Sequence, residues 1–393
     1  MIKPLHTFDL KNKRILMRVD YNAPMNNGRV IDDFRIQSTI PTIEHCLEQG
    51  AAIVLMSHLG RPNGQVDSDL SLMPVGETLA DMLEMPIKFS KDCISEDALD
   101  TSLGISSGEV HLLENLRFHN EEISNDPYFS MLLAKHGEIY INDAFGTAHR
   151  AHASNVGVVK HFKQKGIGFL MEKELEYLKE SFDRPHRPVT LILGGAKIGS
   201  KISLIQRFLT KADNIIISGG MVFTFLKAKG EEIGKSLIDE RMLPIAKQIL
   251  NESRNQKAEL IFPSDFVCSK NIESEPKGVY SRREIPKGLM GLDIGEKSIK
   301  RFNKILSSSN TILWNGPMGV FENENYFMGT ISIAEKLVEL TESGQITIIG
   351  GGDTAAAIRS FGFQRAVTHV STGGGSSLEL LCGESLPAFS VLD

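Results

Sequence analysis

The sequence has few cysteines, and no two of them are close enough along the chain to form a paired motif. Its four cysteines are Cys46, Cys93, Cys268 and Cys382, so no C-x-x-C motif is present. This spacing excludes a zinc ribbon and a thioredoxin-type redox pair, and it predicts buried thiols in a reducing compartment. An excess of positive charge is also missing, since 43 Lys and Arg stand against 49 Asp and Glu, a net charge of −6. This balance argues against a general nucleic-acid-binding protein.

Long hydrophobic segments are absent as well. Residues 1–13 lack the apolar core of a signal peptide, and apolar runs such as 51–56 are far shorter than the roughly 20 residues that span a bilayer. We therefore expect a cytoplasmic protein without a membrane segment. No repeat with a period of roughly 20–50 residues is visible, which excludes a solenoid. The length of 393 residues and the 41% hydrophobic content suggest two or three globular domains.

Short apolar runs alternate with amphipathic stretches along the whole chain. Because the runs are apolar throughout, they favour strands that are covered on both faces, as in the parallel sheets of α/β proteins. We expect strands at residues 14–19, 52–56, 138–141, 190–193, 214–218, 259–262, 311–314, 346–349 and 367–371. So many strands point to two sheets and two domains.

The domain boundary is expected near residues 183–188. Pro185 and Pro188 cannot both lie inside a helix or a central strand. Just before them, apolar residues recur on one helical face, namely Met171, Leu175, Leu178 and Phe182. The pattern predicts a helix that leads from the first domain into the second.

Glycine-rich loops follow several of the expected strands in the second half. They are residues 194–201, 218–220, 350–354 and 373–376. Glycine allows the backbone to approach a ligand closely, and a following helix N-terminus presents N–H groups with a partial positive charge. Any one of these loops could be an ordinary turn. Four of them predict a phosphate or nucleotide site at the carboxyl ends of the strands.

Two common nucleotide-binding motifs are matched only in part. Residues 194–201 have the glycine spacing of a P-loop, but Ser precedes Lys where a P-loop requires Lys before Ser or Thr. Residues 350–355 have the form of a dinucleotide fingerprint, yet no acid occurs between Asp353 and Glu379 to bind ribose. A nicotinamide-dependent dehydrogenase is therefore a disfavoured alternative, and a nucleotide-binding scaffold without activity is another.

Basic side chains follow the expected strands of the first half. They are His58 and Arg61 after the run 52–56, Arg117 and His119 after 110–113, and His149, Arg150 and His152 after 138–141, with Arg35 nearer the start. If these strands are parallel neighbours, several guanidinium groups converge at one sheet edge, which suits a small, highly anionic substrate. Each Arg alone could equally be a solvated or ion-paired residue. The histidines do not have the spacing of zinc ligands, so no zinc site is expected.

Seven motifs, in order along the chain, resemble those of the phosphoglycerate kinase family. They are residues 18–22, 57–62, 114–118, 148–152, 194–201, 314–322 and 350–354. The resemblance implies two doubly wound, Rossmann-like parallel-sheet α/β domains, joined by a helix and facing across a cleft. It also implies reversible, Mg²⁺-dependent phosphoryl transfer from 1,3-bisphosphoglycerate to ADP in glycolysis, carried out by a hinge-bending monomer that binds neither nucleic acid nor membrane.

The resemblance divides the chain into functional parts. Residues 1–168, completed by the tail 380–393, would form the 3-phosphoglycerate domain. Residues 169–182 would form the connecting helix, and residues 183–379 the ATP- or ADP-binding domain. Hinges are expected around 163–169, 183–188 and 371–376.

The resemblance also implies roles for individual residues. The glycerate site is expected at Asp20, Tyr21, Asn22, Arg35, His58, Leu59, Gly60, Arg61, Arg117 and Arg150. The nucleotide site is expected at Lys197, Lys201, Gly219, Gly220, Gly291, Leu292, Asn315, Glu322, Gly350, Gly351, Gly352, Asp353 and Thr354. Glu322 would accept hydrogen bonds from ribose, Thr354 would cap the phosphate-binding helix, and Asp353 would hold Mg²⁺. The catalytic groups would be Arg35, Lys197, Lys201, Gly352 and Gly374.

Overall fold

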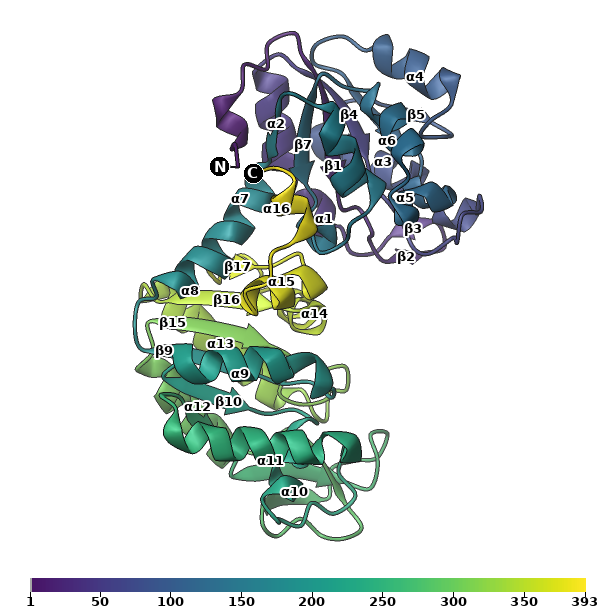
Figure 1. Cartoon of the computed structure of the whole chain (residues 1–393). Helices are drawn as coiled ribbons and strands as arrows, with labels where there is room; N and C mark the ends of the chain where they lie inside the picture. Colours follow the sequence, from purple (N-terminus) through teal and green to yellow (C-terminus); the bar gives the residue numbers. More distant parts are fainter. Residues whose placement is uncertain (1) are drawn as a thin grey trace. The chain divides into compact units, whose positions relative to one another are not determined.

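The computed structural model describes residues 2–393, and the chain forms two compact units (Figure 1). One unit contains the residues up to Glu176 together with Glu384–Asp393, and the other contains Tyr177–Gly383. Each unit is built on its own six-stranded parallel sheet. The prediction of an α/β fold with two parallel sheets is therefore confirmed.

The sheet of the first unit has the strand order β5-β6-β4-β1-β7-β8. The strands are β1 (Arg14–Val19), β4 (Ala52–Met56), β5 (Ile87–Ser90), β6 (Val110–Leu113), β7 (Ile139–Asp143) and β8 (Lys165–Ile167), and a small hairpin joins β2 (Met25–Asn26) to β3 (Arg29–Val30). The helices are α1 (Phe34–Gln37), α2 (Ile40–Glu48), α3 (Met73–Leu83), α4 (Glu96–Leu103), α5 (Asn120–Ser124), α6 (Pro127–Ala134), α7 (Phe169–Leu175) and α16 (Pro387–Ser390). Every residue of β4 and β7 is buried, as expected for central parallel strands.

The sheet of the second unit has the strand order β11-β10-β9-β15-β16-β17. The strands are β9 (Val189–Leu193), β10 (Asn214–Ile217), β11 (Glu259–Ile261), β15 (Thr311–Asn315), β16 (Ile346–Gly350) and β17 (His369–Val370). An antiparallel sheet adds β12 (Asp265–Ser269), β13 (Gly278–Ser281) and β14 (Met290–Ile294). The helices are α8 (Ser181–Asp183), α9 (Ile202–Lys211), α10 (Val222–Ala228), α11 (Leu243–Glu252), α12 (Glu296–Ser307), α13 (Met328–Glu342), α14 (Gly352–Ser360) and α15 (Gly374–Leu381).

All of the expected strands are present, each within two residues of its expected bounds. The chain passes from the first unit to the second within a helical segment, where α7 continues into the π-helical turn Glu176–Glu180. On the predicted apolar face, Met171, Leu178 and Phe182 are buried, whereas Leu175 is only partly buried. Among residues 2–393, no helix is both long and apolar enough to span a membrane.

The C-terminal tail returns to the first unit. The Ala388 N–H donates to the Ala148 carbonyl at 3.1 Å, and the Lys165 ammonium donates to the Val391 carbonyl at 2.8 Å. The Phe389 ring lies 6.4 Å from the ring of Phe145. The last ten residues therefore belong to the first unit, where they contact the segment that follows β7 and the start of β8.

Candidate functional site: two sheet edges

The first candidate site lies at the carboxyl edge of the first sheet. Strands β6, β4, β1 and β7 are consecutive neighbours and all run parallel. The residues that follow these strands therefore meet at one edge. This is the arrangement that the sequence analysis required for the basic side chains to converge.

The centre of this edge is a buried carboxylate with basic partners. Asp20 accepts a bond from Arg35 at 2.5 Å, and its second oxygen lies 3.7 Å from Nδ1 of His58. The same His58 nitrogen lies 3.2 Å from the guanidinium of Arg18. Burial lowers the pKa of His58 well below its usual value, and so do the charges of Arg18, Arg117, Arg150 and Arg35. Four guanidinium groups thus act on one neutral imidazole.

The loop after β4 is held by residues of two neighbouring strand ends. The N–H of Gly60 donates to the Asn22 side chain at 2.9 Å, and its carbonyl accepts from Arg117 at 2.6 Å. Gly60 has a φ of +62°, and a Cβ there would lie 2.6 Å from Leu70. Only glycine fits this conformation without strain. The next residue, Arg61, is exposed at the rim.

The arginines at this edge repel one another. Burial lowers the pKa of Arg117 to about 10, and the charges of Arg150 and Arg18 add to the effect. Burial also lowers the pKa of Arg150, with Arg61, Arg18 and Arg35 acting in the same direction against the opposing charge of Asp20. The Nε atom of Arg117 is buried and has no hydrogen-bond partner within residues 2–393. Such an edge has the charge and the donors to bind a polyanion.

Two of the expected glycerate residues point into the core instead. The hydroxyl of Tyr21 lies 2.9 Å from that of Thr39, and the side chains of Tyr21 and Leu59 belong to the hydrophobic core. Their side chains are therefore not part of the basic edge, and only their backbone lies beside Asp20 and His58.

Sequence reasoning gave no role to a buried network beneath this edge. Arg18 donates to the Ser154 hydroxyl at 2.7 Å, and that hydroxyl donates to Glu122 at 2.6 Å. All three residues are nearly or fully buried. The available signal was an arginine inside the otherwise apolar run 15–19, because a charged side chain is costly to bury without partners.

The second candidate site is a cavity of about 270 Å³ in the second unit. It lies among the loops after β9 and β10, strand β14 and the segment 317–322. Six expected nucleotide residues line it, namely Gly219, Gly220, Gly291, Leu292, Glu322 and Asp353.

Glycines allow the walls of this cavity to form. A Cβ at Gly219, whose φ is +62°, would collide with the backbone of Gly195. A Cβ at Gly291 would collide with the ring of Phe223. Larger residues at these positions would force the walls apart.

The apolar lining of the cavity was not foreseen. It includes Phe223, Leu237, Phe266, Ile272, Met290, Met318, Val320 and Phe321. Asp293 also lines the cavity and accepts from the Gly329 N–H at 2.7 Å, and burial raises the pKa of this carboxyl to about 7. A slot with this lining suits a flat, largely apolar ring system.

The remaining seven expected nucleotide residues do not line the cavity. Lys201 interacts electrostatically with the cavity residue Asp353, and burial lowers the pKa of Lys201 to about 8. Lys197 is exposed. Asn315 is fully buried, and neither polar atom of its side chain has a partner among the described residues. A Cβ on Gly351 would lie 3.1 Å from this amide.

The expectation that Thr354 caps a helix was wrong. Its hydroxyl accepts from the Gly316 N–H at 2.6 Å, and no side chain caps α14. Thr354 is the third residue of α14 and is buried against the loop after β15, so its hydroxyl fixes that loop.

The N-termini of α14 and α15 lie side by side, next to the cavity residue Asp353. A Cβ on Gly374 would lie 3.7 Å from the backbone nitrogen of Gly352, and these residues begin α15 and α14. Helix N-termini attract anions. The two glycines expected to be catalytic therefore belong to one anion-attracting corner.

Comparison with known proteins matches this architecture to a single family. The family model described as phosphoglycerate kinase matches residues 5–384. The chain belongs to the phosphoglycerate kinase family. The phosphoglycerate kinase of Microcystis aeruginosa is 46% identical over 388 residues, which cover 98% of this chain and 96% of that protein. That of Thermosynechococcus vestitus is 46% identical over 394 residues, covering 100% and 98%.

Solved phosphoglycerate kinase structures have the same fold over the whole length. The structure from Coxiella burnetii has a TM-score of 0.88 at 34% identity and covers 100% of this chain and 99% of its own. The structure from Pyrococcus horikoshii OT3 also has a TM-score of 0.88, at 31% identity, with 100% and 98% covered.

Membership of the phosphoglycerate kinase family establishes the activity. The chain is an ATP-binding phosphotransferase of glycolysis whose acceptor is a carboxyl group. The disfavoured dehydrogenase alternative is thereby ruled out. The family generally uses a magnesium-bound nucleotide.

Proposed function

We propose that the basic edge of the first unit binds the phosphoglycerate and that the cavity of the second unit binds the nucleotide. The observation that carries this proposal is the cluster of basic contacts at this edge, where Arg35 bonds to Asp20, Arg18 lies 3.2 Å from His58 and Arg117 donates to the Gly60 carbonyl. A three-carbon phosphate ester is small and has little apolar surface, so charge is the main means of recognising it. The apolar, glycine-walled cavity suits adenosine instead.

Within the glycerate site, we divide the work between two groups of residues. Asp20 and Asn22 contact the hydroxyl and carboxyl end of the glycerate. Arg61, Arg117 and Arg150 hold the phosphate that is not transferred, because guanidinium groups match phosphate oxygens in charge and shape. Arg35, which Asp20 positions at 2.5 Å, points its charge toward the reacting carboxylate.

Within the nucleotide site, the adenine ring occupies the slot between Gly219–Gly220 and Gly291–Leu292. Glu322 accepts hydrogen bonds from ribose. The phosphates extend toward Lys197, Lys201 and the N-termini of α14 and α15. The unpartnered amide of Asn315 supports this direction, because it offers polar atoms that gain a partner when a phosphate or ordered water arrives.

A magnesium ion fits this arrangement at Asp353. Asp353 lines the cavity, is the second residue of α14 and interacts electrostatically with Lys201. Mg²⁺ prefers oxygen ligands and is commonly held by one or two carboxylates together with substrate phosphates. When bound, the ion would neutralise phosphate charge. Asp353 would hold it, and Lys201 would contact the transferring group from another side.

The chemistry needs no general base in this proposal. The nucleophile is already an anion, a carboxylate in one direction and a phosphate oxygen in the other. The main obstacle is repulsion between anions, which Arg35, Lys201 and the two helix N-termini reduce. Gly352 and Gly374 act through their backbone N–H groups. Transfer requires the bound substrates to come together, with hinges at 163–169, 183–188 and 371–376.

The test is ATP consumption in the presence of 3-phosphoglycerate and Mg²⁺, coupled to glyceraldehyde-phosphate dehydrogenase and followed as NADH loss. We expect turnover that requires 3-phosphoglycerate and that falls on the order of 10³–10⁵-fold in Lys201→Ala. Lys300→Ala, which removes an exposed lysine of the same unit, is the matched control. Full activity of Lys201→Ala would contradict the assignment of that residue. A cytoplasmic location and a monomeric state stay predictions from the sequence.

A further inference from the structure

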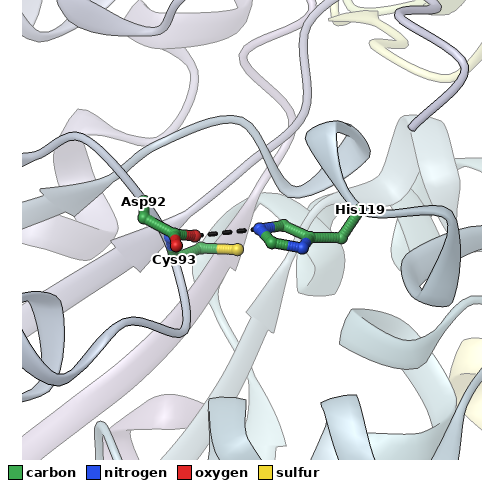
Figure 2. Close-up of side chains that lie close together, drawn as sticks. All are labelled: Asp92, Cys93 and His119. Carbon is green, nitrogen blue, oxygen red and sulfur yellow. Dashed lines mark hydrogen bonds and ion pairs between the residues drawn. The ribbon is translucent and has the colours of Figure 1, made fainter. Parts of the chain in front are cut away.

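A cluster of three potential metal ligands lies outside both sites. Asp92 and Cys93 follow β5, and His119 follows the short helical turn Leu116–Phe118 after β6. Because β5 and β6 are parallel neighbours, the segments that follow them meet. Figure 2 shows the carboxylate, the thiol and the imidazole directed toward one another. Their ligand atoms all lie within 4.8 Å of one another.

The three side chains are already held in place. Nε2 of His119 lies 2.8 Å from Oδ1 of Asp92, and that oxygen also accepts from the Cys93 N–H at 2.5 Å. The Ile94 N–H donates to the same oxygen at 3.3 Å. The His119 ring packs against Phe129, with 5.4 Å between ring centres. Little rearrangement would be needed to gather the three groups around one ion.

The three residues of this cluster differ in how exposed they are to solvent. Cys93 is 1% exposed, whereas the side chains of His119 and Asp92 are 25% and 37% exposed. An ion can therefore reach the cluster from solvent past the imidazole and the carboxylate, with the sulfur beneath them. Three protein ligands with one side open to water is a common arrangement for zinc.

The charges around the sulfur are negative. Three carboxylates, those of Asp92, Glu122 and Glu114, lie close enough to act electrostatically on Cys93. Glu122 and Glu114 are buried themselves and are held by hydrogen bonds from Ser154 and from the Leu72 N–H. Such surroundings oppose a free thiolate nucleophile, and they attract a cation.

We propose that Cys93, His119 and Asp92 bind a zinc ion. Sulfur and imidazole ligands select soft or borderline cations over Mg²⁺, and water would complete a tetrahedral set. On binding, the Cys93 thiol gives its proton to solvent, and the proton shared by Nε2 of His119 and Asp92 moves to Nδ1 of the same ring. Zn–S, Zn–N and Zn–O bonds then replace the hydrogen bond between His119 and Asp92. The sequence analysis expected no zinc site because the histidines do not have the spacing of zinc ligands. The cluster combines one histidine with an aspartate that lies 27 positions away along the chain.

The experiment titrates the full-length, metal-free protein with Co²⁺ in the absence of nucleotide and Mg²⁺. Cobalt occupies zinc sites and gives a sulfur-to-cobalt charge-transfer absorption only when a thiolate binds it. We expect this absorption to saturate at one Co²⁺ per chain and to disappear when Zn²⁺ is added. Cys93→Ala should abolish it, and His119→Gln should weaken Zn²⁺ binding by about 10–100-fold. Cys46→Ala, which removes another buried thiol of the same unit, should change neither result.

Absence of the sulfur-to-cobalt absorption in the unaltered protein would overturn the proposal. So would equal Zn²⁺ affinity in the unaltered protein, Cys93→Ala and His119→Gln. Circular dichroism establishes that each variant is folded. If Cys93→Ala does not fold, His119→Gln decides, because its side chain is partly exposed and its loss opens no cavity in the core. The three proposed zinc ligands are not residues of the glycerate or nucleotide site. A negative result for zinc would therefore leave the proposed function of those two sites unaffected.

Discussion

Both candidate sites lie at the carboxyl edge of a parallel sheet, but they are made of different kinds of residues. The first is a group of charged side chains that meet after β6, β4, β1 and β7. The second is a cavity whose walls are glycine backbone and apolar side chains, with Asp353 and Glu322 among its few charged groups. Both use the carboxyl ends of parallel strands, where Gly-rich turns and helix N-termini lie.

This difference follows from the ligands that the two sites are proposed to bind. A small polyanion offers many charged oxygens and almost no apolar surface, so its site needs fixed positive charge. Adenosine offers a flat ring system, so its site needs an apolar slot of the right width. The first site should therefore be sensitive to charge removal and the second to the addition of single carbon atoms.

The largest expected effect is the removal of Arg35. Arg35→Ala should lower kcat on the order of 10³–10⁵-fold, because it removes a charge that stabilises the transferring group. Steady-state kinetics in both directions measures this loss. Lys11→Ala removes an exposed charge of the same unit and should leave kcat unchanged. An Arg35→Ala enzyme with nearly full kcat would show that charge is not the basis of the first site.

The second prediction tests the width of the cavity. A Cβ at Gly220 would lie 3.0 Å from Leu237 inside the lining, so Gly220→Ala should raise the KM for MgATP by roughly 10–200-fold. The KM for 3-phosphoglycerate should stay the same. At Gly288 nothing lies within 4 Å of an added Cβ, which makes Gly288→Ala the matched control. Equal KM values for MgATP in both variants would contradict a close-fitting slot.

The third prediction concerns the stability of the first unit at acidic pH. Burial lowers the pKa of His111 and of His136 to about 4, and both rings contact the Ser102 hydroxyl. The unfolded chain titrates near 6.5, so it binds more protons than the folded chain between pH 6.5 and 4. The first unit should therefore lose stability over that window, by at most about 3 kcal/mol per histidine. Asp143, whose pKa burial raises to about 7, partly offsets the loss.

The second unit should respond in the opposite direction. Its Asp293 has a raised folded pKa of about 7, so the folded state gains protons first and is stabilised as the pH falls from 7 toward 4. Trp314, the chain's one tryptophan, is buried in β15 and reports on this unit alone. Urea unfolding at pH 7 and pH 4.5 should shift circular dichroism to lower urea more than Trp314 fluorescence. Equal shifts of both signals would contradict the prediction.

The smallest expected effect is a pH dependence of the nucleotide site. The pKa of Lys201 is about 8, so its charge falls to about a tenth one pH unit higher. Half of the Lys201 side chains are charged at pH 8, so kcat/KM for MgATP should decrease about fivefold from pH 8 to pH 9. Lys201→Arg, whose guanidinium stays charged, should have a flat profile over this range. A decrease of the same size in Lys201→Arg would assign the titration to another group.

Most of the fold, and the gathering of basic residues at the edge of the first sheet, could be predicted from the sequence. Strands buried on both faces leave apolar runs, and basic residues directly after such runs can be assigned to a sheet edge once the strands are parallel. The edge strand β5 was harder, because two of its four residues are only partly buried and one is exposed. In the antiparallel sheet, β13 was missed for the same reason, since it has no buried residue.

The second site was predictable only in its glycines and charges. Phe223 and Phe266 pack against each other at 4.8 Å and line the cavity, but in the sequence they look like any other core residues. The role of Thr354 was wrong because a hydroxyl near a helix start can bond to its own helix or to a neighbouring loop. The ligand cluster at Cys93 depends on strand pairing, which spacing along the chain does not reveal.

The mutual repulsion of Arg18, Arg35, Arg117 and Arg150 has a consequence for the life of the protein in the cell. These like charges act on one another at the proposed glycerate site, and a bound polyanion would act as their counterion. Ligands that bind only the folded state stabilise it in proportion to the logarithm of their concentration. A high concentration of phosphoglycerate should therefore protect the enzyme from unfolding and proteolysis. The amount of enzyme in the cell should then rise with the concentration of its substrate.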